Sequence, residues 1–169
     1  MSWSDLVEEK SSLAVALDIV GDKWSLMILS GCFTGVCRFN QFERYLGINR
    51  NLLSSRLDKL VKYGLIKRHR YQKSPPRDEY RITDIGKALR PVIVGLADWG
   101  QAHYTKDDAP LEIIHKDCGG HVHLRVCCKA CDKELKAGEV ETRLRKGAGE
   151  VSKQVYAQMY PDKCKVNSG

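Results

Sequence analysis

Residues 40–82 read NQFERYLGINRNLLSSRLDKLVKYGLIKRHRYQKSPPRDEYRI, and their pattern decides the fold. A short helix is expected over Asn40–Leu46, and after a tight turn a longer amphipathic helix is expected over Arg50–Tyr63. Two strands, Leu65–Gln72 and Asp78–Ile82, follow around a tip whose two prolines limit further pairing. Helix, turn, helix and hairpin in this order predict a winged helix-turn-helix, whose second helix enters the major groove of DNA.

The longer helix is predicted to have a core face and a DNA face. Leucines at 53, 57 and 60 form the core stripe, while Asn49 caps the start and Gly64 the end. On the other face, short polar side chains suit base edges and cations suit phosphates. The residues expected to contact DNA, including those of the wing, are Arg38, Asn49, Arg50, Asn51, Ser54, Ser55, Arg56, Lys59, Lys62, Lys73 and Arg77.

Positive charge is concentrated in the same stretch. The chain has a net charge of +7, and twelve of its 28 Lys/Arg but only four of its 21 Asp/Glu lie between Arg38 and Arg81. The remainder is nearly neutral. Such a local excess is expected where a protein binds phosphates, although a generally basic, solvated surface is the alternative.

Helices are predicted on both sides of this stretch. Ser12–Val20 is amphipathic, and Lys23–Phe33 is apolar nearly all round, which indicates a buried central helix. Val36–Arg38 is a candidate short strand. Thr83 is expected to cap a long helix that Pro91 kinks or interrupts. An apolar stripe on this last helix exceeds the needs of a small core and predicts a dimer interface formed by Leu89, Val92, Leu96, Trp99 and His103.

The composition predicts three segments. Residues 1–105 form the winged helix-turn-helix and dimerisation domain, residues 106–147 a Cys/His-rich, β-rich appendage, and residues 148–169 a tail. In and just before this tail a loop is expected over residues 147–154, and a short helix or a disordered segment over residues 154–169. No apolar run approaches the roughly 20 residues of a membrane span, and the N-terminus lacks a signal-peptide core. A cytoplasmic location is therefore expected, where the seven cysteines are thiols, metal ligands or redox sensors rather than disulfides.

Three separated motifs in this chain resemble those of a known regulator family. They are Ala16–Trp24 (ALDIVGDKW), Arg38–Asn40 (RFN) and Pro75–Thr83 (PPRDEYRIT). Over Ser12–Tyr104 the chain resembles the HxlR-type winged-helix transcriptional regulators of bacteria. The resemblance implies a homodimer, formed through the N- and C-terminal helices, that binds a pseudo-palindromic operator.

The same resemblance implies a recognition helix at Arg50–Tyr63 and a wing at Tyr71–Asp78. Many members of the family carry a sensing cysteine ahead of the Gly-x-Lys-Trp motif, where this chain has Ser11. Serine forms no thiolate, so the usual thiol switch is in question. Cys37 is an alternative redox sensor because the adjacent cation of Arg38 favours a thiolate; the other interpretation is a half-buried structural cysteine.

The Cys/His-rich segment predicts a zinc-ribbon-like site. Zinc takes four tetrahedral N or S ligands, and pairs spaced His-x2-Cys and Cys-x2-Cys each supply half of such a set. The predicted ligands are His115, Cys118, Cys128 and Cys131. His121 or His123 could replace the first of them, and the loop between the pairs is shorter than is usual in ribbons. A small hairpin with reduced or redox-active cysteines is the alternative.

The leading interpretation is a sequence-specific DNA-binding transcriptional regulator. No enzyme is expected, because the candidate ligands form a closed, thiolate-rich set and no phosphate loop, nucleophile elbow or HExxH motif occurs. Two alternatives stay open: a thiol- or metal-responsive regulator that uses the C-terminal cysteines, and a protein-interaction module with an incidental basic face. A small-molecule effector is a further candidate partner.

Overall fold

The computed structural model describes residues 2–161, which fall into two compact units. One unit spans residues 22–127, and the other joins residues 2–21 to residues 128–161. This division differs from the one expected from composition, because the N-terminal helices belong with the last part of the chain rather than with the DNA-binding region. The predicted tail beyond residue 161, with Cys164, lies outside the described residues.

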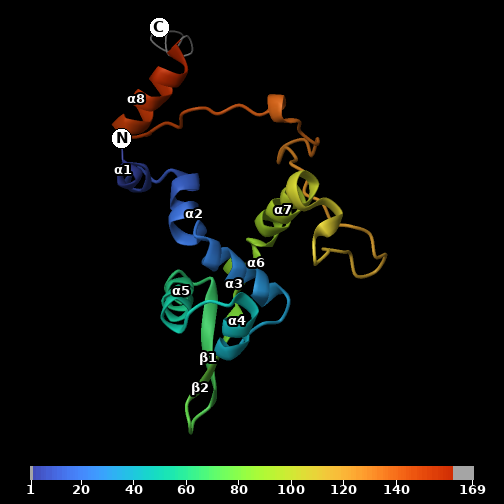
Figure 1. The fold of residues 1–169 in the computed structure, drawn as a ribbon. Helices are drawn as coiled ribbons and strands as arrows, with labels where there is room; N and C mark the ends of the chain where they lie inside the picture. Colours follow the sequence, from blue (N-terminus) through green and yellow to red (C-terminus); the bar gives the residue numbers. More distant parts are fainter. Residues whose placement is uncertain (1, 162–169) are drawn as a thin grey trace. The chain divides into compact units, whose positions relative to one another are not determined.

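The unit of residues 22–127 has the predicted α+β winged helix-turn-helix architecture (Figure 1). Three helices surround a small core, and a two-stranded antiparallel sheet extends from it. The elements are α3 (Lys23–Phe33), α4 (Phe39–Leu46), α5 (Arg50–Lys62), β1 (Ile66–Gln72) and β2 (Arg77–Ile82). Each begins and ends within one or two residues of its prediction.

The core of this unit gathers the apolar faces of α3, α4, α5 and β1. Its fully buried side chains are Ile28, Leu29, Phe42, Leu53, Leu57, Leu60 and Ile66. Helix α3 is less enclosed than its composition predicts, since Met27 is 42% exposed. At Gly31 the rings of Phe42 and Tyr45 pack so close that a Cβ atom would lie 3.3 Å from each of them. A small residue there brings α4 against α3.

The turn between α4 and α5 depends on backbone chemistry. Gly47 ends α4 in the left-handed region, at φ +59°, which glycine adopts without steric cost. The side chain of Asn49 then accepts a hydrogen bond from the backbone N–H of Leu52 at 2.9 Å and caps α5. Gly64, at φ +71°, follows the last turn of α5. Both predicted caps are confirmed.

The wing, residues 66–82, is a regular hairpin with one irregularity. Ile66 pairs with Ile82 and Arg70 with Asp78, and the register shifts between Arg70 and Gln72. All side chains of β1 between its two ends are exposed. The expected strand at Val36–Arg38 is reduced to a single bridge between Arg38 and Glu79, so the sheet keeps only the two strands of the wing.

The predicted long helix after Thr83 is interrupted, as the position of Pro91 requires. Thr83 accepts from the backbone N–H of Gly86 at 3.2 Å and caps the short helix α6 (Asp84–Lys87). A new helix, α7 (Arg90–Gly100), starts with Pro91 in its first turn and continues as the π-helix η1 (Gln101–Thr105) and the short helix η2 (Lys106–Asp108). Proline is tolerated there because N–H groups of a first turn have no helical partner.

The other unit contains α1 (Trp3–Glu8), α2 (Ser12–Val20), η3 (Ala137–Glu139) and α8 (Glu150–Met159). The carboxylate of Glu9 accepts hydrogen bonds from the backbone N–H groups of Val151 and Ser152 at 2.8 and 2.7 Å, and from the Ser152 hydroxyl. These bonds cap the N-terminus of α8 from a residue near the start of the chain, and they lower the pKa of Glu9. The helical alternative is confirmed for residues 154–159, whereas the loop expected over residues 147–154 is wrong from Glu150 on, because α8 already begins there.

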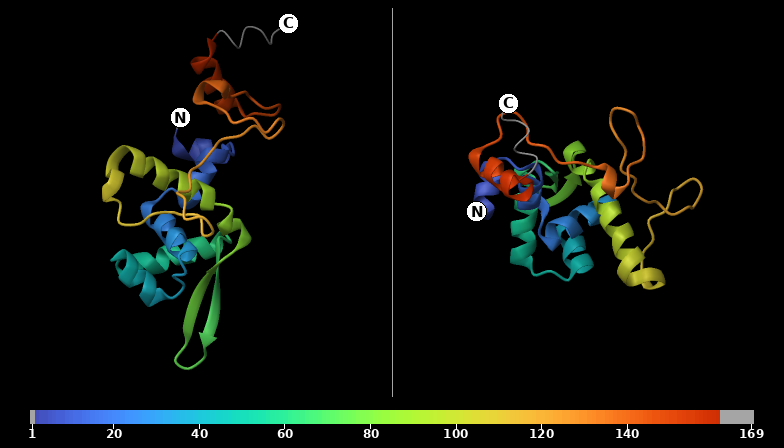
Figure 2. Two further views of the ribbon diagram at one scale, coloured as in Figure 1. Left: turned by 90° about the vertical axis from the view of Figure 1, so that its right-hand side faces the viewer. Right: turned by 90° about the horizontal axis from the view of Figure 1, so that it is seen from above.

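The prediction of a β-rich appendage is wrong for the described residues. Between residues 109 and 127 the chain forms loops rather than strands (Figure 2), with isolated bridge residues at Ile114, His121 and Cys127, of which the first two pair with each other. Val122, Leu124 and Val126 alternate as a strand would, yet all three are exposed. A sheet is stable only if a hydrophobic face of it packs against other apolar residues, and these three side chains have too few apolar neighbours to form such a face.

Candidate nucleic-acid interface

Helix α5 presents a short polar surface to solvent because its opposite face is fixed in the core. Leu53, Leu57 and Leu60 are fully buried. At 3.6 residues per turn this orientation leaves Asn51, Ser54 and Ser55 exposed together on the outer face. Their amides and hydroxyls can both donate and accept hydrogen bonds, which suits them to the edges of bases in a major groove.

Two of the predicted DNA contacts form ion pairs with a carboxylate of the same unit, that of Asp22. Arg56 Nε lies 2.9 Å from Asp22 Oδ1, and Lys59 Nζ lies 3.8 Å from Asp22 Oδ2. Both cationic side chains are only 29% exposed. Sequence periodicity placed them near the DNA face without showing this partner, which is distant in the sequence. In this structure the two ion pairs connect α5 to the N-terminus of α3.

Asp22 also caps α3. Its carboxylate accepts from the backbone N–H of Ser25 at 3.0 Å and from the Ser25 hydroxyl at 2.6 Å. Partial burial alone would raise the pKa of Asp22, but the hydrogen bonds from Ser25 and the charge of Arg56 outweigh it. The pKa of Asp22 therefore lies below its ordinary value of 3.8.

Replacing Asp22 with alanine should lower the free energy of unfolding by about 1–3 kcal/mol at neutral pH, because a cap is lost and Arg56 loses its partner. The folded-state pKa is depressed, so this stabilisation is complete above the unfolded-state pKa and is lost as the pH falls through the folded-state pKa. Denaturant unfolding of wild type and variant at pH 7 and at about pH 3 measures the difference.

The matched control is Asp22→Asn, which keeps an oxygen for the cap and removes the charge. Its loss of stability at pH 7 should be smaller than that of Asp22→Ala. For both variants, the difference in the free energy of unfolding from the wild type should become smaller on acidification. If this difference stays constant from pH 7 to about pH 3, the carboxylate charge has no stabilising role.

A hollow of about 430 Å³ separates the start of α5 from the wing. Three predicted DNA contacts, Arg38, Arg50 and Arg77, line it. The guanidinium of Arg38 lies 4.6 Å from the centre of the Tyr71 ring, and that of Arg50 lies 4.9 Å from the Phe39 ring. The Tyr71 ring holds the cation of Arg38 in place without neutralising it, whereas Arg50 also forms an ion pair with Glu43 at 2.7 Å. The hollow can therefore accept a phosphate.

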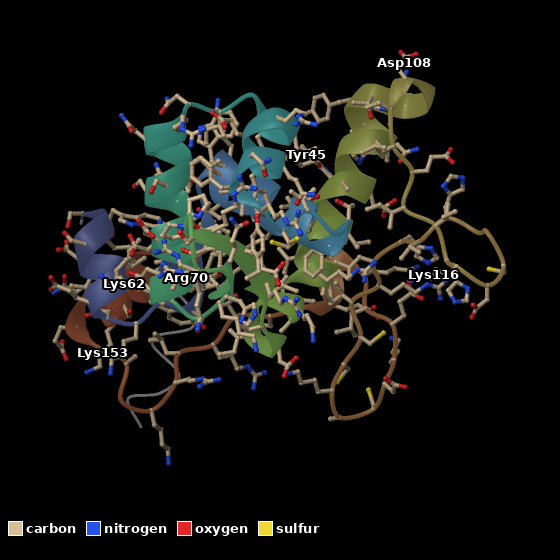
Figure 3. All side chains as sticks on the ribbon, turned by 90° about the horizontal axis from the view of Figure 1, so that it is seen from below. Tyr45, Lys62, Arg70, Asp108, Lys116 and Lys153 are labelled. Carbon is tan, nitrogen blue, oxygen red and sulfur yellow. The ribbon has the colours of Figure 1, made fainter. Side chains whose placement is uncertain are left out.

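The wing carries further positive charge, some of it paired. Lys73 and Arg77 are exposed beside the tip. Arg70 bonds Asp78 at 3.0 Å across the hairpin, which lowers the pKa of Asp78. Arg70 is labelled in Figure 3, in which the molecule is seen from the side of the wing. The sequence run Lys67-Arg68-His69-Arg70 could have identified this basic strand, which was not among the predicted DNA contacts. Its exposed side chains extend the candidate DNA-binding surface along the wing.

The cysteines of this unit differ in environment. Burial raises the pKa of Cys32 to about 12, so this thiol is unreactive and serves in packing. Cys37 is half-buried, and its sulfur lies 3.7 Å from the Gln41 side-chain oxygen. The same oxygen accepts from the backbone N–H groups of Cys37 and Arg38 at 3.1 and 2.9 Å. Cys37 thus belongs to the cap of α4.

The predicted metal ligands are paired rather than assembled. His115 Nδ1 lies 3.2 Å from Cys118 Sγ. In the other pair, hydrogen bonds from the backbone N–H groups of Ala130 and Cys131, and from the Cys131 thiol, lower the pKa of Cys128. Within residues 2–161, no three His, Cys, Asp or Glu side chains converge as a metal ion would require.

Comparisons with known proteins agree with this geometry. The model of the HxlR-like helix-turn-helix family matches residues 19–108. The HTH-type transcriptional regulator Rv3095 of Mycobacterium tuberculosis is 42% identical over 143 residues, which is 83% of this chain and 90% of that protein. Because 83% of this chain is more than residues 1–108 can supply, the similarity extends into the Cys/His-rich segment.

Solved structures give the same result. The candidate transcription factor PA1607 superposes with a TM-score of 0.73 and 31% identity, over 82% of this chain and 99% of its own. The reduced form of the redox regulator HypR superposes with a TM-score of 0.53 and 30% identity, over 58% and 96%. No helix within the described residues is long and apolar enough to cross a membrane. From its fold, the polar face of α5 and these relatives, the chain belongs to the HxlR-like helix-turn-helix family of DNA-binding transcriptional regulators.

Proposed function

We propose that this protein is a sequence-specific regulator that binds a pseudo-palindromic operator as a homodimer. The observation that carries this proposal is the exposed polar triad of α5, Asn51, Ser54 and Ser55, on a helix whose other face is fixed in the core. The recognition helix of a helix-turn-helix protein contacts base edges with residues of its first turns. The arginine-lined hollow and the wing then bind the adjacent backbone.

The dimer is supported by an apolar face on α7. Val92, Leu96 and Trp99 follow at i, i+4 and i+7, and they are 49, 51 and 55% exposed. The Trp99 ring lies 5.7 Å from that of His103 and 5.1 Å from that of Tyr104, which extends the patch. Contiguous apolar surface of this kind marks an interaction site. A two-fold dimer matches an operator with two half-sites.

DNA binding is tested with fluorescence anisotropy on the DNA upstream of the protein's own gene. We expect saturable binding that weakens steeply as the salt concentration rises from about 50 to 200 mM, because the phosphates release counterions when the protein binds them. An unrelated duplex of equal length should bind far more weakly at the higher salt. Absence of binding at low salt would favour a protein-interaction module whose basic face is incidental.

The signal that releases the operator has two candidate sources. The relative HypR is described as a redox regulator, but here Ser11 occupies the position of the family's usual cysteine, so a thiol switch would use other cysteines such as Cys37. A second hollow, of about 450 Å³, is lined by α7, η1 and the following loop, including Ala97, Leu111 and Val122. Its size and apolar walls suit a small organic effector.

A further inference from the structure

The second hollow, beside α7, differs in charge from the rest of the molecule. It has a volume of about 450 Å³ and lies within one compact unit, between the helices α7 and η1 and the loop that follows them. Its apolar walls are formed by Val94, Ala97, Ala102, Ala109, Leu111, Ile113 and Val122. Among the described residues that line it, Asp98 is the only carboxylate and none is a lysine or arginine, although the chain has a net charge of +7.

Four polar side chains interrupt these apolar walls. Asp98, Gln101 and Thr105 come from one side of α7 and η1, and His121 comes from the loop. Within residues 2–161, neither the carboxylate of Asp98 nor the imidazole of His121 has a hydrogen-bond or ion-pair partner. A carboxylate next to apolar surface is stabilised by a cation or a hydrogen-bond donor. In this hollow the protein supplies no cation, so a ligand can supply it.

The hollow and the proposed dimer interface use opposite sides of α7. At 3.6 residues per turn, Val94 and Asp98 point about 160° away from Leu96, which lies in the middle of the exposed apolar face. The helix continues as the π-helix η1, which contributes Gln101 and Thr105 to the hollow. Single π-helical turns within α-helices often occur at functional sites. A ligand in the hollow and a second chain on the apolar face can therefore bind to α7 at the same time.

We infer that this hollow binds an organic cation, an amine on an apolar or aromatic body, with its ammonium group at Asp98. Apolar walls gain free energy when a hydrophobic body covers them, and the few polar groups orient the ligand. Charge selects the class of ligand, because a carboxylate or phenolate would meet the charge of Asp98 with no lysine or arginine to offset it. As the effector of a regulator, this ligand rests on the proposed function, whereas its binding to the chain does not.

Three indoles of similar size and different charge test the inference. Tryptamine is a cation, tryptophol is neutral and indole-3-acetate is an anion. Equilibrium dialysis against the full chain, at one salt concentration and about pH 7, measures the affinity of each. Tryptamine should bind roughly tenfold more tightly than tryptophol, because a hydrogen bond to a charged group contributes more than one between neutral groups. Indole-3-acetate should bind more weakly than either.

Substitutions in the hollow separate the charge from the apolar walls. Asp98→Asn should lower the affinity for tryptamine to about that for tryptophol and leave tryptophol binding within about twofold of the wild type. Ala97→Leu narrows the hollow and should weaken the binding of both. Asp117→Asn is the matched control, since it removes an exposed carboxylate of the same unit that does not line the hollow. It should bind all three indoles as the wild type does, and circular dichroism confirms that each variant is folded.

Three results would overturn the inference: no tryptamine bound at millimolar concentration, indole-3-acetate bound as tightly as tryptamine, or tryptamine affinity unchanged in Asp98→Asn. DNA binding by the ligand-free protein is measured separately by anisotropy. Tryptamine binding without operator binding would refute the proposed regulator and support the amine site. Operator binding without tryptamine binding would refute the amine site and leave the regulator intact.

Discussion

Replacing Leu96 with glutamate should convert the proposed homodimer to monomers and lower the affinity for a full operator by roughly 10²–10⁴-fold. Leu96 lies in the middle of the apolar face of α7, between Val92 and Trp99, and is 51% exposed in the single chain. A carboxylate buried there on association would lose its hydration without gaining a partner. Two linked recognition helices bind two half-sites at a high effective concentration, and monomers do not.

Sedimentation velocity and anisotropy on full and half operators measure these effects. The half-site affinity of Leu96→Glu should equal that of the wild type, which separates a dimerisation defect from misfolding. Leu144→Glu is the control, since this leucine is also exposed but belongs to the other unit. It should leave both the mass and the operator affinity unchanged. A Leu96→Glu protein that sediments as a dimer would remove α7 from the interface.

Replacing Asn51 with alanine should weaken operator binding by about 1–3 kcal/mol, roughly 5- to 150-fold, and leave binding to unrelated DNA unchanged. Asn51 is exposed in the first turns of α5 and can pair with a base through its amide. Titrations against the operator, single-base variants of it and a random duplex, all at one salt concentration, measure the change. The loss of preference should be confined to one base pair in each half-site.

Arg77→Ala provides the contrast. Arg77 lines the hollow beside the wing and is expected to bind phosphate, so its loss should weaken binding to every sequence and reduce the salt dependence by about one counterion. Lys87→Ala removes a similar exposed charge on α6, where it pairs with Asp84, and should change neither quantity. Equal losses for Asn51→Ala and Arg77→Ala on all DNA would contradict the assignment of one to bases and the other to the backbone.

Local signals explain which elements were predictable. Helix α3 starts at the residue after Asp22, and α5 starts after Asn49, because each cap satisfies N–H groups that helical bonding leaves open. Pro91 and Gly47 mark the interruption and the turn for equally local reasons. The polar triad of α5 followed from periodicity once its leucines were assigned to the core.

Long-range contacts explain what could not be predicted. The pairing of Arg56 with Asp22 spans 34 positions, and the capping of α8 by Glu9 spans more than 140. No pattern within a window of sequence contains such partners. The prediction of strands in the Cys/His-rich segment failed for a different reason. Alternating apolar residues form a strand only if another surface covers them, and composition does not show whether the fold provides such a surface.

The attachment of Arg56 and Lys59 to Asp22 has a consequence for specificity. Two cations of α5 are partly neutralised within the protein, so in the proposed complex the polar triad of this helix would add little attraction to DNA in general. Discrimination would then depend on α5, whereas sequence-independent affinity would depend on the wing and the arginine-lined hollow. On this proposal, changes at Asn51, Ser54 or Ser55 should redirect the protein to a new operator and leave its rate of searching along DNA unchanged.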